Sequence, residues 1–120
     1  RDMHGYSLHS YTAPQGFYQH VVPGGAFGVT NWTSLTVDAP CNGESHVKIR
    51  LRAGNTVSAL AQEEWLGPFG PFPPNVFPMD LEAIAGLDGK YLQVEINLIP
   101  DEDGNTPLLK GFSVQFHVVD

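Results

Sequence analysis

Two segments near the C-terminal end of the chain alternate apolar and polar residues, and this feature constrains the fold most. In residues 90–99 every second residue is apolar: Leu92, Val94, Ile96 and Leu98. In residues 108–119 the same pattern recurs with Phe112, Val114, Phe116 and Val118. Because side chains along a strand point alternately to its two faces, the pattern predicts antiparallel strands with one face on a hydrophobic core.

The rest of the chain adds further short strands separated by turn residues. Strands are predicted over residues 17–22, 26–39 and 45–53, with a short strand or turn over 79–87. Residues 56–65 break the alternation and predict a short helix with Thr56 or Asn55 as its cap. Prolines exclude residues 66–78 from a helix or a central strand, and residues 1–16 are interpreted as an extended leading segment. We therefore predict one all-β domain, an antiparallel β-sandwich of jelly-roll type with about eight strands and one short helix.

Composition limits the partners of the chain. The 120 residues carry a net charge of −7 with six lysines and arginines, too few to neutralise a phosphate track, so nucleic acid is not expected as a partner. No apolar run reaches the ~20 residues that cross a bilayer, so membrane insertion is not expected. The single cysteine, Cys41, cannot form an intrachain disulfide. We expect it to be a half-buried small apolar residue, with interchain pairing and a reactive thiol as alternatives.

Polar side chains gather on the predicted outward faces of several strands. If these strands share one sheet, their planar hydrogen-bonding groups form one surface suited to hydroxyls and carboxylates. The alternative is a solvated sheet face with cross-strand Arg–Glu pairs. The candidate ligand-binding residues on this surface are Lys48, Arg50, Arg52, Gln93, Glu95 and Gln115.

Aromatic residues supply a second candidate feature. Phe69 and Phe72 lie in a Gly-Pro-Phe repeat that exposes at least one ring unless another part of the chain covers it. We predict that one of them stacks on a ligand at the rim of the surface. The alternative is a lid packed on the sandwich. Trp32 is expected in the core.

An acidic loop between the last two strands is a candidate calcium site. Asp101, Asp103 and Asn105 place oxygen ligands at alternate positions around a glycine, and such ligands suit Ca²⁺. The spaced bidentate glutamate of an EF-hand is missing. The alternative is an acidic hairpin turn, and no other cofactor is expected.

Catalytic motifs are not found in the sequence, so we expect a protein that is not an enzyme. The five histidines are scattered, and no nucleophile elbow, phosphate loop or helical zinc motif is present. Glu63 and Glu64 are adjacent and point different ways on a helix, which disfavours a paired acid and base. The triplet beginning at Asn31 fits an N-glycosylation acceptor in a host that glycosylates.

Four stretches between Ser45 and Phe116 carry a family resemblance: residues 46–52, 65–70, 89–95 and 106–114. They contain, in order, a strand of alternating arginines, a Trp-x-Gly-Pro loop, a Gly-x-Tyr-x-Gln strand and a Thr-Pro turn. In this order they resemble the galactose-binding-like (discoidin-type jelly-roll) modules of secreted and surface bacterial proteins. The resemblance implies an extracellular or cell-surface accessory domain, although the binding residues of such modules do not transfer to this chain.

We therefore expect a non-catalytic extracellular module that binds a glycan or another polyhydroxylated ligand. The alternative is a structural subunit of a surface filament, pilus or similar assembly. In that case residues 1–16 and the 66–78 loop would contact neighbouring protomers or another protein partner at the cell surface.

Overall fold

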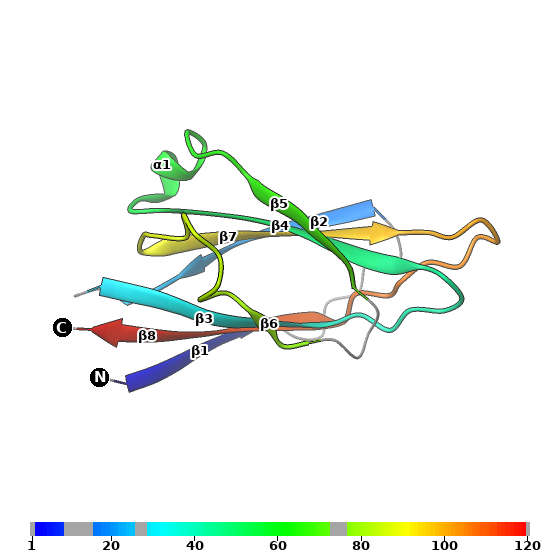
Figure 1. The fold of residues 1–120 in the computed structure, drawn as a ribbon, viewed down its shortest axis with the longest axis horizontal. Coiled ribbons are helices and arrows are strands. Elements are labelled where there is room, and N and C mark those ends of the chain that lie inside the picture. The colour runs from blue at the N-terminus through cyan, green and yellow to red at the C-terminus, as the bar shows by residue number, and fades with distance from the viewer. Residues whose placement is uncertain (1, 9–15, 26–28, 73–76, 120) are drawn as a thin grey trace.

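The computed structural model of this chain describes residues 2–8, 16–25, 29–72 and 77–119, which form two sheets packed face to face (Figure 1). Sheet I has the order β1-β8-β3-β6, with β1 Asp2–Leu8, β8 Gly111–Val119, β3 Val29–Asp38 and β6 Met79–Asp80. Sheet II has the order β2-β7-β4-β5, with β2 Gly16–Pro23, β7 Tyr91–Ile99, β4 His46–Gly54 and β5 Leu66–Phe72. The short helix α1, Val57–Leu60, follows β4.

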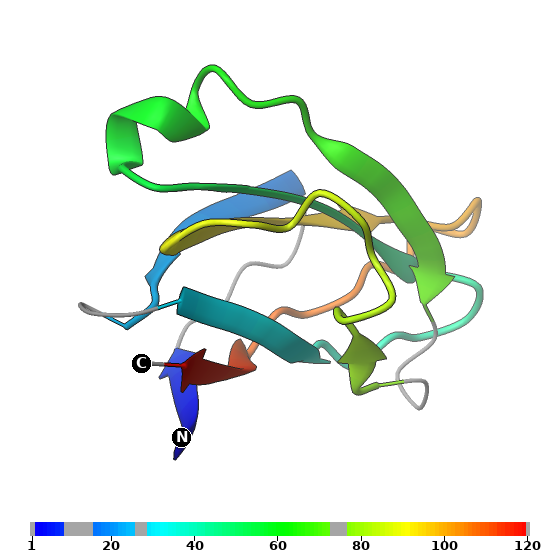
Figure 2. The same cartoon turned by 60° about the vertical axis from the view of Figure 1, so that its left-hand side comes forward.

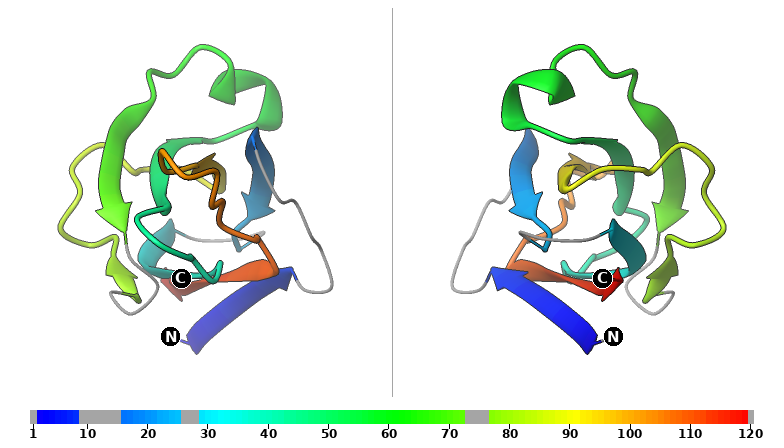
Figure 3. Two further views of the ribbon diagram at one scale, coloured as in Figure 1. Left: turned by 90° about the vertical axis from the view of Figure 1, so that its right-hand side faces the viewer. Right: turned by 90° about the vertical axis from the view of Figure 1, so that its left-hand side faces the viewer.

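The order of the strands confirms a jelly roll. All strand pairs are antiparallel, and the first strand pairs with the last, the second with the seventh, the third with the sixth and the fourth with the fifth. Successive strands therefore alternate between the two sheets, except for the β4–β5 step within sheet II. Figures 2 and 3 show the two layers from the side and from their ends. The predicted all-β sandwich with one short helix is confirmed.

The core lies between the sheets and is built from the alternating apolar residues. The alternating apolar residues of β4 and β7 are buried: Val47, Ile49 and Leu51 in β4, and Leu92, Val94, Ile96 and Leu98 in β7. Trp32 is also buried, as predicted, and its indole nitrogen donates to the Gly89 carbonyl oxygen at 3.1 Å. A register shift between Trp32 and Ser34 marks a β-bulge or irregularity in this long strand.

The helix cap is confirmed in atomic detail. The hydroxyl oxygen of Thr56 accepts a hydrogen bond from the Ala59 amide at 3.0 Å, which satisfies one of the free amides of the first turn. Leu60 is the buried residue of the helix. In Figures 1 and 3, α1 lies on the side of sheet II that faces away from sheet I.

The proline-rich segment forms β5, an edge strand that repeats every three residues. Gly67 and Gly70 have φ values of 106° and 117°, which only glycine adopts freely, and each precedes a proline. Each repeat has three residues, one more than the two-residue period of a regular strand. Leu66, Phe69 and Phe72 therefore point to the same side, where they pack against the core. The exclusion from a helix or central strand is confirmed for the described part of the segment, residues 66–72 and 77–78.

One strand and one loop differ from what the sequence predicts. Residues 2–8, interpreted only as an extended leading segment, form β1 and pair along their length with β8. The interpretation of the acidic loop as a hairpin turn is wrong, because β7 and β8 belong to different sheets and the chain crosses the sandwich between them. Residues 9–15 and 73–76, which fall in the two predicted protomer-contact segments, lie outside the described residues.

A tyrosine–histidine cluster joins the edge strands of the two sheets. The His20 ring of β2 contacts the hydroxyl groups of Tyr6 from β1 and Tyr18 from β2 through its two nitrogens. The Phe112 ring packs edge-on against the same imidazole. Burial in this apolar setting lowers the pKa of His20, because desolvation disfavours the charged imidazolium. The cluster therefore ties β1 to β2, and burial favours the neutral form of the histidine.

Candidate functional site

The outer face of sheet II carries three rows of side chains that run across β4, β7 and β2. We call this surface the polar face, and its rows follow from the strand registers. The first row is Lys48, Asn97 and Phe17. The second is Arg50, Glu95 and Gln19. The third is Arg52, Gln93 and Val21. The structure thus brings five predicted site residues together: Lys48, Arg50, Arg52, Gln93 and Glu95.

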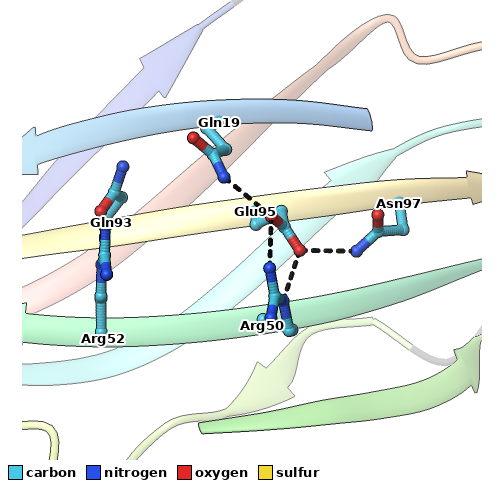
Figure 4. Close-up of polar contacts among 6 residues, drawn as sticks. All are labelled: Gln19, Arg50, Arg52, Gln93, Glu95 and Asn97. Carbon is cyan, nitrogen blue, oxygen red and sulfur yellow. Dashed lines mark hydrogen bonds and ion pairs between the residues drawn. The ribbon is translucent and has the colours of Figure 1, made fainter. Parts of the chain in front are cut away.

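Glu95 lies at the centre of the polar face and is only 3% exposed (Figure 4). Its Oε2 accepts from Arg50 Nε at 2.5 Å and from Asn97 Nδ2 at 2.8 Å. Its Oε1 accepts from Arg50 Nη2 and Gln19 Nε2, both at 2.8 Å. Because a carboxylate offers about four lone-pair positions, all of them are occupied.

These bonds stabilise the charged form of Glu95. The hydrogen bond from Arg50 is the largest cause that lowers its pKa, to about 2, and the bonds from Asn97 and Gln19 add to it against the desolvation penalty. The same interaction raises the pKa of Arg50. Glu95 is therefore ionised and fully bonded at neutral pH, which suits it to orient its neighbours and not to exchange protons.

Trp65 packs against the two arginines of the polar face. Its ring centroid lies 4.1 Å from the Arg52 guanidinium carbon and 4.8 Å from that of Arg50, within the range of cation–π attraction. Arg52 Nε also donates to Gln93 Oε1 at 2.7 Å. Trp65 and Gln93 therefore hold Arg52 in place.

An open groove lies over the first two rows, with a volume of about 510 Å³. Its lining residues are Phe17, Gln19, Lys48, Arg50, Pro68, Glu95, Asn97 and Ile99. Phe17 is 63% exposed, and no other large apolar side chain among the described residues is as exposed. The groove thus combines charged and amide groups with an aromatic wall, the mixture typical of small-ligand sites.

Three predicted site residues do not belong to this surface. Gln115 lies on β8 in sheet I, so the expectation that it shares a face with Arg50 and Glu95 is wrong. Phe69 and Phe72 are half-buried and pack against the core, so the expected exposed aromatic rim is wrong and the alternative, packing on the sandwich, is the one observed. The three-residue repeat of β5 turns both rings inward and leaves Pro68 at the groove.

The structure adds residues that sequence reasoning did not select. Phe17, Gln19 and Asn97 enter the site because their strands flank β7 or belong to it, and Trp65 enters through its arginine contacts. Asn97 could have been found from the alternation of β7, which places it on the same face as Gln93 and Glu95. Gln19 and Phe17 could not, since the pairing of β2 with β7 spans more than 70 residues of sequence.

The acidic loop has a structural role that centres on Asp101. Its carboxylate accepts from the backbone amides of Glu44, Asp103 and Asn105 and from the Asn105 side chain, at 2.8–3.0 Å. The bond from the Asn105 side chain is the main reason that the pKa of Asp101 is lowered. Within the described ranges no three His, Cys, Asp or Glu side chains gather around a common point for a metal ion. Calcium binding by Asp101, Asp103 and Asn105 stays a prediction.

Two further candidates are placed by the structure. Cys41 is half-buried, as expected, and its thiol donates to the Ala39 carbonyl oxygen, while burial raises its pKa. Asn31, the predicted glycosylation acceptor, is exposed on β3. In the part of the chain that the structure describes, no helix has the length and apolar character needed to cross a membrane.

Comparisons with protein-family models, curated proteins and solved structures found no match to this chain. The resemblance to galactose-binding-like modules therefore stays a prediction, and the site rests on its own geometry.

Replacing Glu95 by Gln tests the central interaction. The variant leaves Arg50 without its charged partner, and we expect the free energy of unfolding at neutral pH to fall by about 2 kcal/mol, since Arg50 is partly solvated. The folded-state pKa of about 2 lies below the ordinary 4.5, so this contribution is complete above pH 4.5 and is lost as the pH falls to 2. Urea unfolding of both proteins across this range measures it.

Glu64→Gln, an exposed change of the same chemistry, serves as the control and should leave the free energy of unfolding within ~0.5 kcal/mol of the wild type. If Glu95→Gln and Glu64→Gln behave alike, or if the Glu95 effect does not shrink on acidification, the proposed ion pair does not stabilise the protein.

Replacing Asp101 by Ala tests the acidic loop. The variant leaves four N–H groups without their acceptor, and we expect a lower melting temperature. Asp103→Ala, in the same loop but exposed, should melt like the wild type. Wild-type curves that coincide in excess calcium and in chelator would contradict the calcium site. A calcium-dependent rise in melting temperature that Asp103→Ala abolishes would support it.

Proposed function

We propose that this domain is a non-catalytic module that binds a glycan or another polyhydroxylated ligand in the groove on the polar face of sheet II. The observation that carries the proposal is the combination of Phe17, an exposed aromatic ring, with fixed hydrogen-bonding groups in one groove. The extracellular or cell-surface setting rests on the family resemblance of residues 45–116.

The groove offers both kinds of hydrogen-bonding partner that a hydroxyl group needs. A hydroxyl donates one hydrogen bond and accepts others, so a site for polyols requires donors and acceptors side by side. Lys48 and Arg50 supply N–H donors, of which two on Arg50 are used by Glu95. Gln19 and Asn97 each direct an amide nitrogen to Glu95, which leaves their carbonyl oxygens as acceptors (Figure 4).

Glu95 supports this proposal because it orients the surrounding groups before a ligand arrives. Three side chains that would contact the ligand are each fixed by a hydrogen bond to one buried carboxylate. Fixed side chains lose less conformational freedom when a ligand binds, and that increases affinity. The groups also lie on strands and not on loops, which further limits their movement.

Phe17 supplies an apolar surface for the ring of a sugar. The C–H groups of a pyranose form an apolar face, and burial of that face against an aromatic ring is favourable. Phe17 lies in the same row as Lys48 and Asn97, so a ring stacked on it keeps its hydroxyl groups within reach of polar partners. Pro68 and Ile99 extend the apolar lining.

A glycan array tests the proposal, with the wild type compared with Phe17→Ala. We expect the wild type to bind a defined set of glycans and Phe17→Ala to bind them about tenfold more weakly, because the stacking surface is lost. Leu108→Ala removes an exposed apolar side chain outside the groove and should bind like the wild type. A wild type that binds nothing on the array contradicts the function, and equal binding by Phe17→Ala contradicts the location.

A second function, a subunit of a surface assembly, is favoured by β1. This strand is at the edge of sheet I, and its other side has no neighbouring strand among the described elements. Its sequence has no proline or lysine, the residues that commonly protect an edge from pairing with another chain. We propose, as the alternative, that an extended segment of another protomer adds to β1.

Light scattering over a concentration series tests this alternative. Assembly through β1 predicts a mass that rises above the 13.1 kDa of one chain and that Ser7→Lys reduces by placing a charge on the edge. Ser58→Lys, an exposed change in α1, is the control and should assemble like the wild type. A constant mass of one chain at every concentration rules out self-assembly.

A further inference from the structure

Lys48 is the one cation of the groove without a partner among the described residues. It lies on β4 opposite Asn97 of β7, which in turn lies opposite Phe17 of β2. Its side chain is half-buried and lines the groove, yet no described carboxylate lies within ion-pair distance of its ammonium group. Lys48 therefore presents a positive charge to whatever enters the groove.

The two arginines of the polar face, unlike Lys48, each have side-chain contacts within the protein. Arg50 and Glu95 neutralise each other through two hydrogen bonds. Arg52 is bonded to Gln93 and covered by the Trp65 ring. Arg52 does not line the groove, and Arg50 and Glu95 cancel, so the groove keeps one net positive charge, that of Lys48, on a chain whose net charge is −7.

The positions of Lys48 and Phe17 set the shape of a ligand. The two residues are separated by two strand spacings, roughly 10 Å, with Asn97 between them. A sugar ring on Phe17 with a charged substituent directed at Lys48 fills this span. Asn97 then lies beneath the ring, where its carbonyl oxygen can accept from a hydroxyl group.

We propose that the ligand of this groove is an acidic sugar, with its anionic group at Lys48 and one ring face on Phe17. This inference rests on the proposed function and adds the substrate class to it. A lysine ammonium is a compact point charge without the planar fork of arginine, so it accommodates a carboxylate and a sulfate alike. The shared chemistry is a sugar ring with one negative group near it.

Screening by salt makes the attraction between Lys48 and an anionic group short-range. At physiological ionic strength charges are screened over ~8 Å, so the net negative charge of the protein neither attracts nor strongly repels a ligand at a distance. Selection for an acidic sugar then depends on direct contact with Lys48. For this reason substitution of Lys48 should alter selectivity more than any other charge change on the surface.

An array of matched acidic and neutral glycans tests this inference. The probes are oligogalacturonate, hyaluronan and alginate oligosaccharides, each beside its methyl-esterified counterpart, and a sulfated galactan beside the neutral galactan. For the wild type we expect an acidic glycan to bind about tenfold more tightly than its neutral counterpart. Lys48→Gln should remove this preference, so that the acidic and the neutral member of each pair bind with equal affinity. The carboxylate and sulfate arms identify which anion is used.

Lys110→Gln is the matched control, since it removes one exposed lysine next to β8 in sheet I and should keep the preference. Wild-type binding to neutral and acidic members of a pair with equal affinity overturns the inference and leaves the proposed function standing. If Lys48→Gln keeps the preference for acidic glycans, Lys48 does not bind the anionic group and the inference is overturned. Absence of binding to any glycan overturns both proposals together.

Discussion

Alternation in the two central strands of sheet II fixes the core and the polar face at once. Along β4 and β7 the same backbone register that buries Ile49 and Val94 places Arg50 and Glu95 opposite each other on the outer face. A slip of one residue would turn the apolar set to solvent and the charges into the core. The Arg50–Glu95 pair is made only in the correct register, so the core and the candidate site specify the same alignment.

Glu95 shows how a buried charge can organise a surface. An ionised carboxylate with little exposure is costly unless hydrogen bonds and an opposite charge compensate for lost solvation. Here four N–H donors from three side chains provide that compensation. The outcome is a carboxylate with no free lone pair, surrounded by groups that keep further hydrogen-bonding positions. Its chemical role is therefore to position Gln19, Arg50 and Asn97.

The faces of the strands could be predicted from the sequence, but the sheet that each strand joins could not. Alternation correctly places Gln115 on an outer face, yet it does not indicate which of two outer faces. In a jelly roll, strands that are neighbours in the sequence usually belong to different sheets. β8 is therefore in sheet I while β7 is in sheet II, and Gln115 lies on the outer face of sheet I. For the same reason the acidic loop spans the sandwich. The Asp101 carboxylate therefore accepts a hydrogen bond from the backbone amide of Glu44, a residue that precedes β4.

Local backbone conformation explains the other differences. The inward direction of Phe69 and Phe72 depends on positive φ at Gly67 and Gly70, which gives β5 a period of three that an alternation analysis does not detect. β1 was not predicted as a strand because its residues are mostly polar and it is stabilised by pairing with β8. Phe17 and Gln19 reach the site only through the pairing of β2 with β7, a contact between distant parts of the sequence.

The distribution of positive charge gives the strongest physical reason to regard the polar face as a site. Half of the six lysines and arginines of this acidic chain lie on one face of β4, at Lys48, Arg50 and Arg52. Neighbours on one face of a strand are roughly 7 Å apart, so these like charges repel one another. Glu95 offsets the repulsion for Arg50, and Trp65 and Gln93 hold Arg52, but no described group compensates Lys48. A neutral residue at position 48 would serve folding equally well. An anionic ligand, in contrast, would gain binding free energy from the uncompensated charge of Lys48.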